Sequence, residues 1–226
     1  HAAAETTGGQ ASGGSSETGR HRTYKITYPS TRPPTSVIET SVLLEMGVRG
    51  GADPHESMPI TSLLGETLSA TIADSRRYDD LTIFNIEVLH PARTLLEKLD
   101  NVHGIALQLV DDPDHDVPYR SGRHFYDIYE LLATDRVLKW LQDRDQMLVV
   151  VNNIAEISQR YFVGTTTTTR PHDGYGASPV FDPTSAASAK AKRAYESTMP
   201  ELYFGTGELP TWDQILERIA NHAGLL

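Results

Sequence analysis

Cysteine is absent from all 226 residues of the sequence. This absence excludes thiolate catalysis, cysteine-based zinc sites and a disulfide scaffold, and it fits a reducing compartment. No apolar run reaches the roughly 18 residues that a membrane-spanning helix needs. We therefore expect a chain without a membrane span and a cytoplasmic location.

Several common catalytic motifs are missing as well. The sequence contains no GxxxxGK[ST] phosphate loop, no GxGxxG, no HExxH and no GxSxG nucleophile elbow. Asp112, Asp114 and Asp116 are spaced like the first ligands of an EF-hand loop. However, Val117 stands at the position of the turn glycine and Arg123 at that of the bidentate glutamate, so we expect no calcium site there.

The charge balance is acidic, with a formal net charge of −10. Such a balance argues against a nucleic-acid partner, because phosphate contacts are made mainly by Lys and Arg. The basic residues are nevertheless clustered along the chain: Arg20, Arg22 and Lys25; Arg76 and Arg77; Arg120 and Arg123; Lys190, Lys192 and Arg193. Bulk charge alone does not decide whether the chain binds nucleic acid.

The order of predicted elements indicates an α+β protein. Residues 1–21 are rich in Gly, Ser, Ala and Thr and are predicted to be a flexible lead-in. Alternating patterns predict strands over RTYKITYP (22–29), VIETSVLLEMGVRGG (37–51) and LTIFNIEVLH (81–90), the first two as a hairpin. PITSLLGETLSATIADS (59–75) is predicted to be a short helix or irregular, and 163–188 a long loop.

The second half is predicted to be helical. Apolar residues at helical spacing, with Pro91 suited to a first turn, predict helices over 92–109, 123–143, 145–162, 189–199 and 209–226. Within 145–162, MLVVV (147–151) is also compatible with a strand. Thr211 is expected to cap the last helix, with Gln214 completing a capping box.

One lysine and one aspartate border the apolar stripes of their helices. Lys98 lies three residues after Leu95, and Asp127 lies four residues before Leu131. If the two helices pack side by side, Lys98 and Asp127 face one cleft. Periodicity alone favours a helix–helix salt bridge, and an active-site pair is the alternative.

The segments VLHPARTLLEKLDNVH and RHFYDIYELL, at this spacing, resemble the AbiEii-type nucleotidyltransferase toxins, which include the MenT toxins. The resemblance extends upstream through YKITYP and VLLEMGVRGG, and downstream to LPTWDQILERI, so that it covers roughly residues 22 to 222. It implies a polymerase-β-like nucleotidyltransferase fold with a helical C-terminal half. On this basis 22–90 are the remainder of the α/β core and 91–226 the helical part.

The resemblance also implies a function. Family members are toxins of toxin–antitoxin or abortive-infection systems, and they act with a nucleoside triphosphate and Mg²⁺. Some transfer nucleotides to the 3′ end of tRNA and so block translation. We therefore expect a cognate antitoxin and tRNA or another RNA acceptor as partners, and no membrane partner.

The same resemblance assigns roles to individual residues. Lys98 matches the active-site lysine and Asp127 the catalytic aspartate of the second half, as base, metal ligand or orienter of the lysine. Glu45 is the predicted metal ligand, on a looser match. Arg93 and Arg123 are predicted either to bind nucleotide or RNA or to be structural. A lysine can offset charge that develops on a phosphate, and carboxylates can hold Mg²⁺.

One family motif is not found in the sequence. A Gly-Ser turn followed by Asp-x-Asp on a strand is the family's metal-binding segment, whereas GGSSETG at 13–19 is followed by no acid pair. The chain begins with His1, so we expect the motif in residues that precede it, the alternative being a divergent member. On either account this chain alone is expected to lack the main metal ligands and to be inactive unaided. The competing functions are a catalytically inactive module that binds antitoxin or RNA, and an unrelated α+β protein.

Overall fold

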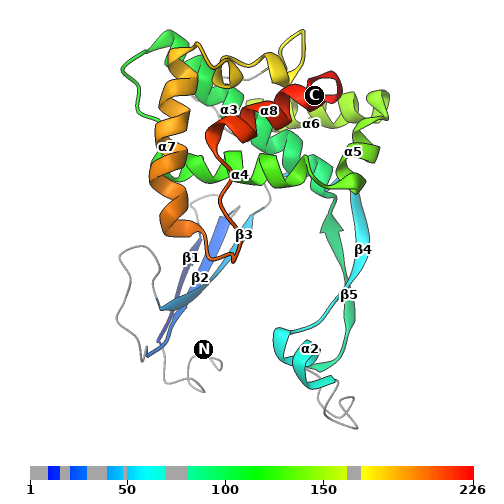
Figure 1. The fold of residues 1–226 in the computed structure, drawn as a ribbon. Helices are drawn as coiled ribbons and strands as arrows, with labels where there is room; N and C mark the ends of the chain where they lie inside the picture. The colour runs from blue at the N-terminus through cyan, green and yellow to red at the C-terminus, as the bar shows by residue number, and fades with distance from the viewer. Residues whose placement is uncertain (1–9, 16–20, 30–39, 48–49, 70–80, 162–168) are drawn as a thin grey trace.

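The computed structural model describes residues 10–15, 21–29, 40–47, 50–69, 81–161 and 169–226. Figure 1 shows a helical body from which two strand-built arms extend on the same side. Helices and small antiparallel sheets occur together, which confirms the predicted α+β class. No helix in these ranges is long and apolar enough to cross a membrane.

The first arm is a three-stranded antiparallel sheet in the order β1-β2-β3. Its strands are β1 (Gln10–Ser15), β2 (His21–Thr27) and β3 (Ser41–Gly47). The pairing of β2 with β3 confirms the predicted hairpin. The lead-in prediction is wrong for Gln10–Ser15, because a run poor in β-formers still pairs along its whole length with β2. Residues 1–9 and 16–20 of that lead-in lie outside the described residues.

The second arm is a separate two-stranded sheet of β4 (His55–Ile60) and β5 (Phe84–Leu89). Helix α2 (Leu63–Ser69) lies at its far end, where a short helix or irregular segment was expected (Figure 1). The strand expected over 81–90 is confirmed as β5. Strand β4 was not predicted from the sequence. Its Pro59 is tolerated because β4 has a pairing partner on one side only in this sheet.

The body consists of six helices and four short 3₁₀ turns among the described residues. The helices are α3 (Pro91–Asp111), α4 (Gly122–Leu131), α5 (Asp135–Leu141), α6 (Arg144–Tyr161), α7 (Ala186–Leu202) and α8 (Trp212–His222). The turns are η3 (Tyr119–Ser121), η4 (Tyr175–Ala177), η5 (Pro179–Phe181) and η6 (Ala223–Leu225).

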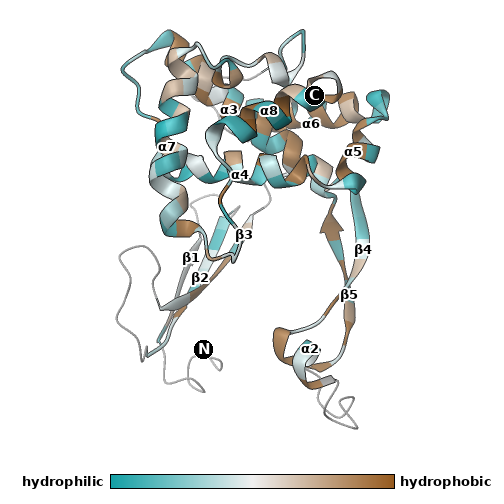
Figure 2. Cartoon of the chain, in the orientation of Figure 1, coloured by the Kyte–Doolittle hydropathy of each residue, from teal (hydrophilic) through white to brown (hydrophobic). Residues whose placement is uncertain are grey.

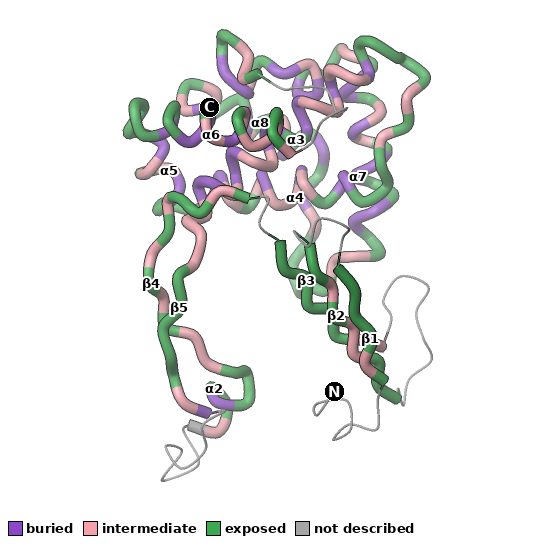
Figure 3. Tube along the Cα trace, turned by 180° about the vertical axis from the view of Figure 1, so that it is seen from behind, coloured by how far each residue is buried: buried purple, intermediate pink, exposed green. Residues whose placement is uncertain are grey.

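Helix α3 is the centre of the core and packs against α4, α5, α7 and η5. Its fully buried residues repeat at helical spacing, as predicted: Leu95, Leu99, Val102 and Ala106. Figure 3 shows that buried residues are concentrated in the body, whereas the arms are mostly intermediate or exposed. This distribution gives α3 a rigid setting from which to present its remaining side chains.

The single helix predicted over 123–143 is wrong, since two helices occupy this range. Helix α4 ends at Leu131, and α5 begins at Asp135 after Thr134, whose backbone is extended (φ −95°, ψ 112°). Threonine and aspartate favour helix starts over helix interiors, which explains a break that the apolar pattern alone conceals. The break lies after Asp127, so this residue remains within the uninterrupted helix α4.

The expected long loop is irregular in its described part but is not a surface segment throughout. Tyr175, Val180 and Phe181 in η4 and η5 are buried against the helical core. Helix α8 begins with the predicted capping box, in which the Thr211 hydroxyl accepts from the Gln214 N–H and the Gln214 side chain accepts from the Thr211 N–H.

Candidate active site

Lys98 from α3 and Asp127 from α4 meet where these two helices pack. The Lys98 Nζ donates to Asp127 Oδ2 over 2.6 Å. The side chains keep 20% and 36% of their exposure, so that a ligand can reach both. The contact confirms the expectation from the sequence that the two side chains face each other.

Local features of each helix fix the positions of this pair. At the start of α3 the His90 Nδ1 accepts from the Ala92 N–H, and Pro91 occupies the first turn. At the start of α4, Gly122 allows close contact with α7, because a Cβ there would lie 2.5 Å from the Ala194 carbonyl oxygen. Both helices are thus held by contacts independent of the ion pair.

His124 lies one helical turn before Asp127, beside the ion pair. Burial, and then the positive charges of Lys98 and Arg123, lower its pKa to about 4, although Asp127 opposes this shift. The imidazole is therefore neutral at physiological pH. His124 was not among the site residues predicted from the sequence, although its three-residue spacing from Asp127 was a signal that could have identified it.

The two predicted arginines differ in their surroundings. Arg123 is exposed on the first turn of α4, and its charge acts on His124. Arg93 is 1% exposed; its guanidinium donates to Glu97 at 2.8 Å, to Asn153 at 2.9 Å and to the Asp53 carbonyl. Of the two roles predicted for Arg93, these bonds support the structural one, and a contact with nucleotide or RNA stays a prediction.

Glu45 lies on β3, opposite Thr23, with its Oε1 3.9 Å from the His21 Nε2. Its side chain is 61% exposed. Among the residues that the structure describes, no group of three or more His, Cys, Asp or Glu is placed to hold a metal ion. The metal role of Glu45 therefore stays a prediction.

Comparison with family models decides the lineage of this chain. Residues 2–218 match the model of the nucleotidyl transferase AbiEii toxin of a type IV toxin–antitoxin system. The chain belongs to the AbiEii family. No curated protein and no solved structure matched it. The match excludes the unrelated α+β protein and supports a nucleotidyltransferase fold.

Membership of the AbiEii family gives the chain a general chemistry and a partner. The protein is a toxin-type nucleotidyltransferase, and its toxin–antitoxin setting implies an antitoxin. In this AbiEii chain, the predicted residues Lys98 and Asp127 contact each other, and both side chains are partly exposed.

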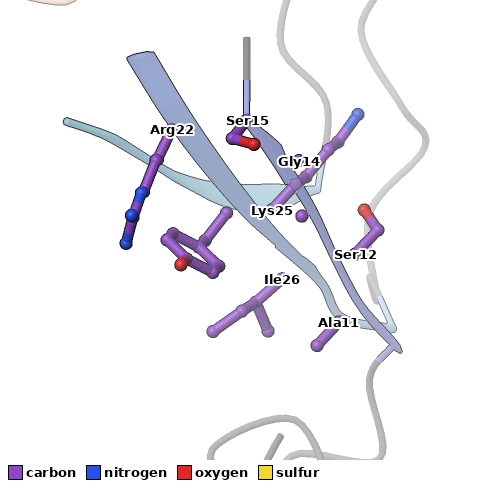
Figure 4. Close-up of a pocket in the computed structure, with 9 residues that line it drawn as sticks. Ala11, Ser12, Gly14, Ser15, Arg22, Lys25 and Ile26 are labelled. Atoms are coloured by element: carbon purple, nitrogen blue, oxygen red, sulfur yellow. The ribbon is translucent and has the colours of Figure 1, made fainter. Parts of the chain in front are cut away.

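The described part of the chain also contains hollows away from this pair. A hollow of about 450 Å³ lies along β1 and β2, lined by Gly13, Arg22, Tyr24 and Lys25 among others. Figure 4 shows Arg22 and Ile26 on one side of β2 and Lys25 on the other. A second hollow of about 290 Å³ lies beside Arg93 and Glu97. Lys98 and Asp127 line neither of these two hollows.

Proposed function

We propose that this AbiEii protein transfers a nucleoside monophosphate from a nucleoside triphosphate to an RNA, with the 3′ end of tRNA as the acceptor, and that the modified tRNA no longer supports translation. The observation that carries the proposal is the 2.6 Å Lys98–Asp127 pair, partly exposed between two core-anchored helices. Mg²⁺ belongs to the proposal as the ion that accompanies a nucleoside triphosphate.

In the transfer, the acceptor hydroxyl oxygen forms a bond to the α-phosphorus. The bond from that phosphorus to the bridging oxygen breaks, pyrophosphate leaves, and the hydroxyl proton is released. Negative charge increases on phosphate oxygens during this exchange, and an ammonium group held in place stabilises that charge. Lys98 supplies the ammonium group, and Asp127 supports it by fixing its direction.

A transfer assay tests the proposal. The complete protein is incubated with Mg²⁺, each labelled nucleoside triphosphate and total tRNA, and labelled tRNA is expected with at least one nucleotide. Transfer to periodate-oxidised tRNA should fail, since that treatment removes the terminal hydroxyl groups. Label on oxidised tRNA would exclude the 3′ end as the acceptor, and the absence of label on any RNA would refute the proposed transfer.

Two variants connect the activity with the site. We expect Lys98→Ala and Asp127→Ala to abolish both transfer and toxicity, with unchanged circular dichroism. Lys139→Ala and Asp116→Ala remove the same charges from exposed positions and should keep full activity. Full toxicity of either site variant would show that the pair has no catalytic role.

A second function, an inactive module that binds antitoxin or RNA, is favoured by one observation: the described residues contain no group of three or more His, Cys, Asp or Glu placed to hold a metal ion. If this function is correct, the complete protein binds RNA or its antitoxin but labels no RNA with any nucleotide.

A further inference from the structure

His124 has two ring nitrogens in different environments. Its Nδ1 is buried and has no hydrogen-bond partner. Its Nε2 has no hydrogen-bond partner among the described residues and is not one of the buried unpaired atoms, so part of its surface is open. The described residues thus leave both ring nitrogens of His124 without a partner beside an ion pair, and a ligand that bonds to the more open one, Nε2, would account for that nitrogen.

The charges around His124 determine which hydrogen bond it can make. Lys98 and Arg123 are the positive groups that act on it and Asp127 the negative one, and together with burial they keep the ring neutral. A neutral imidazole carries one N–H. An unpaired buried N–H is rarer than an unpaired buried acceptor, so the proton belongs on Nε2 and the lone pair on Nδ1. His124 therefore offers one N–H toward solvent beside Lys98.

We propose that the Nε2–H of His124 donates a hydrogen bond to a phosphate oxygen of the substrate, near the cations Lys98 and Arg123. The chemical class of this ligand rests on the proposed function. The phosphate belongs either to the nucleoside triphosphate or to the RNA backbone, and the test separates these two sources.

A neutral donor suits this position better than a third cation. A protonated His124 would lie one turn from Asp127, where opposite charges pair on a helix surface, and would compete with Lys98 for that carboxylate. The neutral ring avoids this competition and still contributes a directed hydrogen bond. Hydrogen bonds to charged groups contribute more than neutral ones, so the loss of this bond should weaken phosphate binding about tenfold or more.

Three variants at His124 test the donor atom by atom. In His124→Gln the amide nitrogen can occupy the position of Nε2, whereas in His124→Asn it corresponds to Nδ1, and His124→Ala has no donor. Binding of inorganic triphosphate to the complete protein is measured by calorimetry in one arm, and binding of tRNA without nucleotide in the other. Thermal melts establish that each variant is folded.

We expect Ala and Asn to weaken binding about tenfold or more in one arm, while Gln stays within about threefold of wild type. Loss in the triphosphate arm assigns the bond to the nucleotide, and loss in the tRNA arm assigns it to the RNA backbone. Equal binding by all variants in both arms, a Gln variant as weak as Ala, or a wild-type protein that binds neither probe would overturn the proposal. If the wild-type protein transfers nucleotides and the three variants bind both probes as well as it does, only the His124 inference is refuted. If the wild-type protein binds triphosphate but transfers no nucleotide, only the proposed function is refuted.

Discussion

The helical body and the strand-built arms differ in what covers their apolar side chains. On α3, Leu95 and Leu99 have no exposed surface, whereas on β3 Val42 and Leu44 are 59% and 53% exposed. Figure 2 shows hydrophobic residues in both parts, including α2 and β5 at the end of the second arm. Hydrophobicity of the sequence therefore does not distinguish the two parts, but burial does.

This difference indicates where the folding free energy arises and why the candidate site lies where it does. Burial of apolar surface contributes about 25 cal/mol per Å², and most of it occurs in the body (Figure 3). Lys98 lies on α3, between residues of that core, so its Cα is held in place by residues that do not take part in the chemistry. A site on the arms would lack such support from the described residues.

The largest expected effect compares one leucine from each part. Leu99→Ala should lower the free energy of unfolding by about 2–5 kcal/mol, because it leaves a cavity in a close-packed core. Leu44→Ala removes the same atoms from an exposed strand position and should cost less than about 0.5 kcal/mol. Urea denaturation followed by far-ultraviolet circular dichroism measures both, and equal losses would show that the sheet is as well packed as the body.

A smaller effect is expected from pH at the edge of the body. The pKa of His124 is about 4 in the folded chain and 6.5 ordinarily, so the folded state binds fewer protons between these values. The neutral ring's contribution to the free energy of unfolding is complete above pH 6.5, and it is lost as the pH falls toward 4. The shift corresponds to about 3 kcal/mol for a shielded group, and partial exposure reduces this to about 1–2 kcal/mol.

The variant His124→Gln isolates this contribution. The difference in unfolding free energy between wild type and variant should change by this amount between pH 7 and pH 4.5, in favour of the variant at the lower pH. Urea unfolding at both pH values gives the difference, in which other titrating groups cancel. A difference that does not depend on pH would show that the folded state does not keep the ring neutral.

The sequence was most informative where one pattern fixed one element. The spacing of Leu95, Leu99 and Val102 was sufficient to predict α3 and the side on which Lys98 lies. The Thr211 capping box was equally local. Strand β1 and the break at Thr134 were missed, because pairing with β2 and a single extended residue override what composition and periodicity suggest.

The candidate site was predictable in part, for a comparable reason. Facing helices place Lys98 and Asp127 together, and periodicity reveals facing sides. Two of the three partners of Arg93 come from positions 40 and 60 residues away along the chain, and no local pattern encodes such contacts. The unpaired nitrogens of His124 likewise depend on packing between helices that only the three-dimensional structure shows.

The smallest expected effect on stability comes from the Lys98–Asp127 pair itself, and it distinguishes a structural salt bridge from an active-site pair. With 20% and 36% of the side chains exposed, the coupling energy in a double-mutant cycle of Lys98→Met and Asp127→Asn should be below about 1 kcal/mol. Transfer activity should nevertheless fall about 100-fold or more in each single variant, and little further in the double variant, because the two groups act as one unit. A structural bridge gives the opposite result, a larger coupling in stability and an activity that falls only as far as the folded fraction does. The pair would then belong with the core contacts of the body, and the catalytic groups would have to be sought elsewhere in the chain.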